Sequence, residues 1–353
     1  MQKKLLNFQA DKIEMVLAAH KAPARVWGGR FTPRTVQFHL APAATTKVSK
    51  LETLTEEVAL ALGVSSARLT RENGTLSLEV PRADSRFVSL AELNKRLEQD
   101  EGLHRALSVP GTAILGLDNE GVPLLLRLSS PDVAHCLIAG TTGSGKTELA
   151  RTLVASLTLH QKPRDVQIAI FDPKAHSFSL FANVPHLLFP LVSQIADTLE
   201  RMQYLVQEME RRDQMQVIRP RIIVVVDELA DVLQTCGKEI ETWLTRLVQR
   251  GRSAGISVIA CTQKPSAAVV GTLMRANFPV RMVGRVTSAN DALVAAGMGG
   301  TGAEKLAGRG DFLLIAGGQV IRFQAAQTNV RDLMMNEPGK PKGLAARMLR
   351  VVK

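Results

Sequence analysis

The chain has 353 residues, and its 45% apolar content is enough for about two domains with their own cores. Its formal net charge of +11 indicates a polyanionic partner, with surface charge that serves only solubility as the open alternative, and its 4% aromatic content disfavours base-stacking platforms for single strands. The sequence has no run of 18 apolar residues, no signal peptide and no Cys/His cluster, so we expect a soluble, cytoplasmic chain without a membrane segment and without a metal site other than Mg²⁺.

Residues 1–110 are expected to form a small, basic α/β domain. Apolar spacing and alternation predict its elements, which are helices over 8–19, 50–62 and 90–98 and strands over 35–40 and 75–80. The second helix places Leu51, Leu54, Val58 and Leu62 on one face. The segment 107–111, with its Pro-Gly pair, is the expected domain boundary.

Residues 111–337 are expected to form a larger domain in which short apolar strands alternate with helices, a pattern typical of a mostly parallel sheet. The predicted strands are 135–139, 166–171, 222–226 and 256–261, between an opening hairpin over 112–128 and a closing hairpin over 311–325. Ser193 is predicted to cap a long amphipathic helix that reaches Arg212. The tail 338–353 is predicted to be basic and flexible.

A complete phosphate-binding loop follows the predicted strand 135–139 and precedes a helix. Its glycines allow backbone N–H groups to turn toward a phosphate, and the helix N-terminus adds partial positive charge. Lys146 is expected to reach the β- and γ-phosphates of ATP, and the Thr147 hydroxyl is expected to bind Mg²⁺. The predicted ATP-binding residues are Gly140, Thr141, Thr142, Gly143, Ser144, Gly145, Lys146, Thr147 and Glu148.

Polar residues also follow three of the other predicted strands. Because ligands bind at the carboxyl ends of parallel strands, we expect Asp227 to hold Mg²⁺ and Glu228 to orient the attacking water. Gln263 is predicted to sense the γ-phosphate. The string 172–174 (Asp-Pro-Lys) is expected at the same edge, and ordinary loop chemistry is the alternative for it and for Gln263.

Several strings resemble the FtsK/SpoIIIE family of DNA-translocating ATPases and cover nearly all of residues 111–316 in the family's order. They begin at His135 (HCLIAGTTGSGK), Phe171 (FDPK), Val184 (VPHLL), Glu208 (EMERR), Val226 (VDELAD), Gly251 (GRSAGI), Thr262 (TQKPS) and Gly302 (GAEKLAGRGD). From Phe38 onward, the first domain more faintly resembles the family's N-terminal motor subdomain.

The resemblance implies a RecA-like P-loop NTPase core preceded by a small α/β domain. It also implies a ring, usually a homo-hexamer, that hydrolyses ATP to move double-stranded DNA through its centre. A neighbouring subunit would supply a catalytic arginine, for which Arg252 is the first candidate, ahead of Arg281 and Arg309. Segments around Gly237 and over 264–275 resemble pore-facing loops, so the candidate DNA-phosphate contacts are Lys238, Lys264 and Arg275, with solvated loop residues as the alternative.

Some features depart from the family pattern. Large cell-division members have membrane helices before the motor, many have a winged-helix domain after it, and this sequence shows neither. The stretch 286–292 lacks the basic residues that usually follow the equivalent strand. Two other functions stay open: a secretion-type ATPase that moves protein and ignores DNA, and a nucleotide-switched DNA clamp that does not move, against which Glu228 argues.

Overall fold

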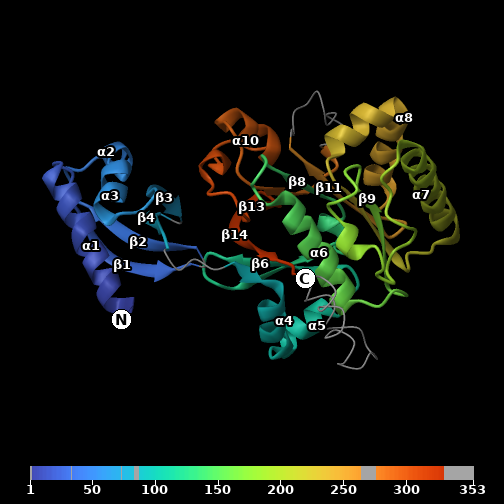
Figure 1. Cartoon of the computed structure of the whole chain (residues 1–353), viewed down its shortest axis with the longest axis horizontal. Helices are drawn as coiled ribbons and strands as arrows, with labels where there is room; N and C mark the ends of the chain where they lie inside the picture. The colour runs from blue at the N-terminus through green and yellow to red at the C-terminus, as the bar shows by residue number, and fades with distance from the viewer. Residues whose placement is uncertain (1, 33, 73, 83–86, 264–275, 330–353) are drawn as a thin grey trace, which may run out of the picture. The chain divides into compact units, whose positions relative to one another are not determined.

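The computed structural model describes residues 2–32, 34–72, 74–82, 87–263 and 276–329 (Figure 1). The chain forms two compact units: an N-terminal unit of residues 1–87 with the hairpin tip 119–121, and a C-terminal unit of residues 88–118 and 122–353. The division falls before Val88 and not at the expected boundary 107–111. The reason is that helices α4 (Leu90–Glu98) and α5 (Glu101–Leu107) pack on strand β6 (Thr112–Asp118) of the C-terminal unit.

The N-terminal unit is a four-stranded antiparallel sheet in the order β1-β2-β4-β3, packed against helices. Its core joins Ile13 and Leu17 of the first helix to Phe38 and Leu78 of the sheet. The elements are α1 (Gln2–Ala19), β1 (Ala24–Phe31), β2 (Thr35–Pro42), α2 (Val48–Thr53), α3 (Thr55–Leu62), β3 (Arg68–Glu72) and β4 (Thr75–Pro81).

Two details of this unit differ from the sequence-based prediction. The single helix expected over 50–62 is two helices, because the backbone leaves the helical region at Leu54 (φ −95°, ψ 6°). Strand β1 was not predicted because Gly28 and Gly29 interrupt its alternation, and its pairing with β2 is irregular between Val26 and Gly28. The predicted apolar face holds in part, since Leu51, Leu54 and Val58 are buried.

The C-terminal unit contains a mixed sheet in the order β7-β6-β14-β13-β12-β8-β11-β10-β9. The strands from β12 to β9 are parallel to their neighbours, whereas the pairs from β12 to β7 are antiparallel. The remaining bounds are β5 (Val88–Ser89, paired with β14), β7 (Pro123–Arg127), β8 (Cys136–Ala139), β9 (Val166–Phe171), β10 (Arg221–Val226), β11 (Ile256–Thr262), β12 (Val280–Val283), β13 (Asp311–Ala316) and β14 (Gln319–Gln327).

Helices cover both faces of the parallel strands (Figure 1). One core contains α6 (Lys146–His160) and the inward residues Ile223 and Val225 of β10. The other contains α7 (Ile195–Met215), α8 (Leu229–Arg250) and the alternate residues Ile222, Val224 and Val226. Burial on both faces is the reason that this strand is apolar without interruption.

The start of α7 differs from the prediction. The helix begins at Ile195 after Gln194, whose carbonyl oxygen accepts hydrogen bonds from the backbone N–H and the hydroxyl of Thr198. Ser193 is therefore not the N-cap. Of the cysteines, Cys136 and Cys261 are buried, as expected for structural thiols. Within the part of the chain that the structure describes, no helix has the length and apolar character needed to cross a membrane.

Candidate nucleotide-binding site

The parallel strands bring the predicted site residues to one edge of the sheet. The phosphate loop follows β8, Asp172 follows β9, Asp227 follows β10 and Gln263 follows β11. Because these strands are parallel neighbours, their carboxyl ends lie side by side, which is where open α/β sheets bind ligands. Helix α6 begins at the same edge and directs its N-terminus toward it.

The phosphate loop requires glycine at two points of close approach. Gly140 has φ +154°, and a Cβ there would lie 2.7 Å from the hydroxyl oxygen of Ser144. Gly145 has φ +103°, and a Cβ there would lie 2.7 Å from the backbone nitrogen of Gly310. A Cβ at either position would clash with a neighbouring atom, so the loop has the tight backbone path that a phosphate cradle needs.

Lys146 is the first residue of α6, and its side chain is buried. Its ammonium group donates to the carbonyl oxygen of Thr141 at 3.3 Å. Burial lowers the pKa of Lys146, while the nearby carboxylates of Glu228 and Asp227 act in the opposite direction. A phosphate chain in the loop would supply more of the negative charge that this buried ammonium group needs.

Asp227 and Thr147 offer the oxygen ligands that suit Mg²⁺. Burial raises the pKa of Asp227; a hydrogen bond from Ser177 opposes this rise, and the carboxylates of Asp172 and Glu228 add to it. A divalent cation would favour the ionised carboxylate. The described residues contain no cluster of three or more His, Cys, Asp or Glu side chains placed to hold a metal.

Glu228 is buried and connects to the phosphate loop through Gln263. One carboxylate oxygen of Glu228 accepts from the backbone N–H of Gln263 at 3.0 Å, and the other lies 4.0 Å from the ammonium group of Lys174. The side-chain oxygen of Gln263 accepts from the hydroxyl of Thr142 at 3.0 Å. Glu228 also has φ +54°, a strained value for a non-glycine residue and one that is concentrated at functional sites.

Comparison with known proteins shows which family the chain belongs to. The sequence profile of the FtsK/SpoIIIE family matches residues 99–217 and 213–267, and that of the FtsK alpha domain matches residues 1–82. A DNA translocase FtsK from Staphylococcus aureus is 31% identical across an alignment that covers 92% of this chain. The chain belongs to the FtsK/SpoIIIE family.

A further relative agrees with this membership, and solved structures share the fold. The DNA translocase FtsK of Listeria monocytogenes is 31% identical over 88% of this chain. The chain spans 43% and 44% of the Staphylococcus and Listeria relatives, less than half of their length. The pCW3 conjugation coupling protein TcpA, solved with ATPγS, has a TM-score of 0.62 at 17% identity and covers 98% of this chain and 99% of its own. The type VII secretion ATPase EccC of Thermomonospora curvata has a TM-score of 0.54 at 22% identity over 62% of this chain and 29% of its own. The predicted P-loop ATPase fold is thereby confirmed.

Asp172 stabilises the loop that follows β9 at this site. It is buried, and its carboxylate accepts from the backbone N–H groups of Lys174 at 3.2 Å and Phe178 at 3.0 Å. These bonds fix the turn after β9 and thereby hold Lys174 near Glu228. Asp172 thus shapes the loop that follows its strand.

Two supports of the phosphate loop were missed in the sequence. The carbonyl oxygen of Arg285 accepts from the N–H of Thr141 at 2.8 Å and from its hydroxyl at 3.0 Å. The N–H groups of Arg309 and Gly310 donate to the carbonyl oxygens of Gly143 at 2.9 Å and Ser144 at 2.7 Å. These are backbone contacts between distant segments, which residue types alone do not reveal.

The three candidate arginines occupy different places. Arg252 is exposed in the turn between α8 and β11, at the end of β11 opposite the one that Gln263 follows. Arg281 donates to the carbonyl oxygens of Phe278 and Ala295, both at 3.5 Å, and is held within its own unit. Arg309 is attached to the phosphate loop of its own chain.

The candidate DNA contacts are covered only in part by the structure. Lys238 is exposed, but the segment around it is a kinked helix and not the expected loop, because Gly237 (φ 73°, ψ −157°) interrupts the helical backbone within α8. Lys264 and Arg275 lie outside the described residues.

Proposed function

We propose that this chain is an ATP-dependent motor that moves double-stranded DNA through a ring of six copies. The observation that supports this most is the 31% identity to DNA translocases over 92% of the chain, together with the polar residues gathered around its phosphate loop. The net charge of +11 suits a partner gripped by its phosphates. Because ATP and duplex DNA occur together in the cytoplasm, we place the motor there.

The proposed chemistry assigns one task to each group at the edge of the sheet. Lys146 binds the β- and γ-phosphates, and the bound Mg²⁺, which neutralises developing negative charge, is held by Thr147 and Asp227. Glu228 accepts the proton of the attacking water and orients it. Gln263 senses the γ-phosphate while its backbone holds Glu228 in place.

Two further groups complete the proposal. Arg252 of one subunit completes the site of the next, a role that its exposed position in the turn between α8 and β11 allows. Lys264, which directly follows Gln263 in the chain, and Arg275 contact the DNA phosphates. Lys238 would add a third phosphate contact.

Steady-state ATP hydrolysis with and without long duplex DNA, across a salt series, tests this function. We expect strong stimulation by duplex DNA that fades as salt rises, because phosphate contacts release counterions. Hydrolysis that ignores duplex DNA at every salt concentration would contradict the proposal and favour a motor that moves protein.

A further inference from the structure

The phosphate loop has two flanks with different chemistry. On the side of β10 and β11 lie Glu228, Gln263 and Lys174, which can act on a γ-phosphate. On the side of β12 and β13 lie Arg285 and the segment 308–310. A triphosphate whose γ-phosphate lies next to Glu228 therefore extends its ribose end toward the second flank.

The segment 308–310 lies directly against the phosphate loop. Besides the two N–H bonds from Arg309 and Gly310, the carbonyl carbon of Arg309 is 3.6 Å from where a Cβ on Gly145 would be. The guanidinium of Arg285 also borders this segment, with its Nε 3.7 Å from where a Cβ on Gly308 would be. Two basic side chains thus arise next to the same phosphate-binding backbone.

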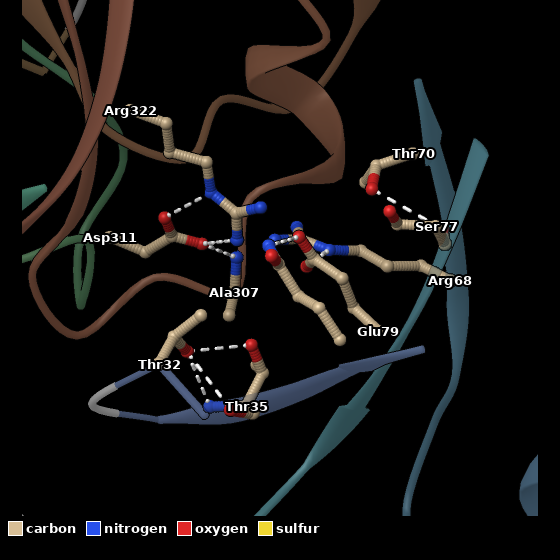
Figure 2. A network of polar contacts seen from close by, with 10 residues as sticks. Thr32, Thr35, Arg68, Thr70, Ser77, Glu79, Ala307, Asp311 and Arg322 are labelled. Atoms are coloured by element: carbon tan, nitrogen blue, oxygen red, sulfur yellow. Dashed lines mark hydrogen bonds and ion pairs between the residues drawn. The ribbon is translucent and has the colours of Figure 1, made fainter. Parts of the chain in front are cut away.

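A rigid frame holds this segment in place. Asp311 makes a two-bond ion pair with Arg322, at 2.8 and 2.9 Å, and accepts from the N–H of Ala307 at 2.8 Å (Figure 2). Gln324 donates to the carbonyl oxygen of Arg309 at 3.1 Å. Because these bonds fix both sides of the turn, the position of Arg309 relative to the phosphate loop is set by the fold.

Arg309 occupies a conformation that disfavours any side chain. Its φ is +51°, a value that glycine adopts freely and that costs other residues roughly 1 kcal/mol or more. The residue is also exposed. Strain of this kind is concentrated at ligand-binding positions.

We propose that Arg309 binds the nucleotide held by its own subunit, through the phosphates nearest the ribose. This inference rests on the proposed ATP binding and removes Arg309 from the candidates for an arginine supplied to a neighbour. A guanidinium suits this task because it forms charge-assisted hydrogen bonds to phosphate oxygens. Lys146 and Gln263, not Arg309, contact the γ-phosphate. The affinities for ADP and for ATP should therefore depend on Arg309 equally.

The test is the affinity of the purified chain for fluorescent ADP and ATPγS, at a protein concentration where sedimentation shows monomers. Arg309→Gly removes the guanidinium while relieving the backbone strain, so its thermal unfolding midpoint should not fall. We expect this variant to lower the affinity for both nucleotides by roughly tenfold or more, the usual effect of losing a hydrogen bond to a charged group. Arg309→Lys should recover part of the affinity, and Lys305→Ala controls for loss of one positive charge in the same segment.

Each outcome separates this inference from the proposed function. If Arg309→Gly binds both nucleotides as tightly as the unaltered chain, the inference is overturned, while loss of binding in Lys146→Ala would still support the ATP site. If monomers bind normally and only assembled rings lose hydrolysis, Arg309 acts on a neighbour and the inference is also overturned. If Arg309→Gly lowered the affinity for ATPγS alone, the proposed contact of Arg309 with the phosphates nearest the ribose would be contradicted.

Discussion

At the scale of single residues, we expect Lys146 to serve nucleotide binding and Glu228 to serve hydrolysis. Lys146 begins α6 within the phosphate loop, and burial lowers the pKa of its ammonium group. A nearby phosphate would stabilise the charged form of this group. Glu228 lies across the loop, tied to the backbone of Gln263 at 3.0 Å. Removing the first group should therefore prevent binding, and removing the charge of the second should leave bound ATP intact.

Two variants check this division. Lys146→Ala should lose measurable nucleotide binding, whereas Glu228→Gln should bind ATP normally and hydrolyse it roughly 10² to 10⁴ times more slowly, the usual contribution of a positioned base. Equilibrium binding and single-turnover hydrolysis measure both. Glu241→Gln, which changes an exposed carboxylate on the helix that follows Glu228, is the matched control. Full hydrolysis by Glu228→Gln would remove Glu228 from its role.

At the scale of elements, the phosphate loop depends on the segment that backs it. Gly145 lies so close to Gly310 that an added Cβ would approach its nitrogen to 2.7 Å. The loop's shape is therefore fixed by a contact between residues far apart in the chain.

Gly145→Ala should consequently disturb the loop more than backbone strain alone would. Its matched control is Gly317→Ala, where φ is +56° and an added Cβ would meet nothing within 4 Å. We expect Gly317→Ala to lose about 1 kcal/mol of stability from its positive φ alone. Gly145→Ala should lose more than that, because its Cβ also clashes with Gly310, and only Gly145→Ala should lose nucleotide affinity. Equal affinity for the two variants would show that the close approach has no functional effect.

The histidine that precedes strand β8 should make the stability of the chain depend on pH. His135 is buried, its Nδ1 accepting from the N–H of Val258 at 3.1 Å, and burial lowers the pKa of His135 to about 4. Between pH 6.5 and about 4, the histidine of the unfolded chain, with its pKa near 6.5, binds a proton that the folded chain does not bind. The contribution of the buried neutral His135 to the free energy of unfolding is therefore complete above pH 6.5 and is lost as the pH falls toward 4.

The variant His135→Asn keeps a hydrogen-bond acceptor and does not titrate. Urea unfolding at pH 7 and pH 4 should show that the unaltered chain loses roughly 3 kcal/mol more than this variant does. Equal losses in both proteins would mean that His135 does not carry this part of the acid sensitivity.

The sequence shows some of these elements far better than others. Strand 166–171 and helix 90–98 were predicted with their observed bounds, because each is a continuous or periodic apolar segment between polar residues. The split at Leu54 and the kink at Gly237 were not predicted, since both depend on backbone angles set by packing. The supports from Arg285 and 308–310 were missed for a related reason: they use backbone atoms, which every residue type has.

At the scale of the whole molecule, both units carry the family's signature. The FtsK alpha domain profile matches residues 1–82 of the N-terminal unit, and the FtsK/SpoIIIE profile matches within the C-terminal unit. The similarity to TcpA also covers 98% of the chain, so both units have counterparts in one solved protein.

The measurement that tests this function most directly is displacement of a third strand annealed to long duplex DNA. With ATP, the unaltered chain should release the third strand at a rate that grows with ATP concentration, and Glu228→Gln should release none although it binds the same DNA. Turnover of ATP on this DNA without any release by the unaltered chain would contradict movement and favour a nucleotide-switched clamp.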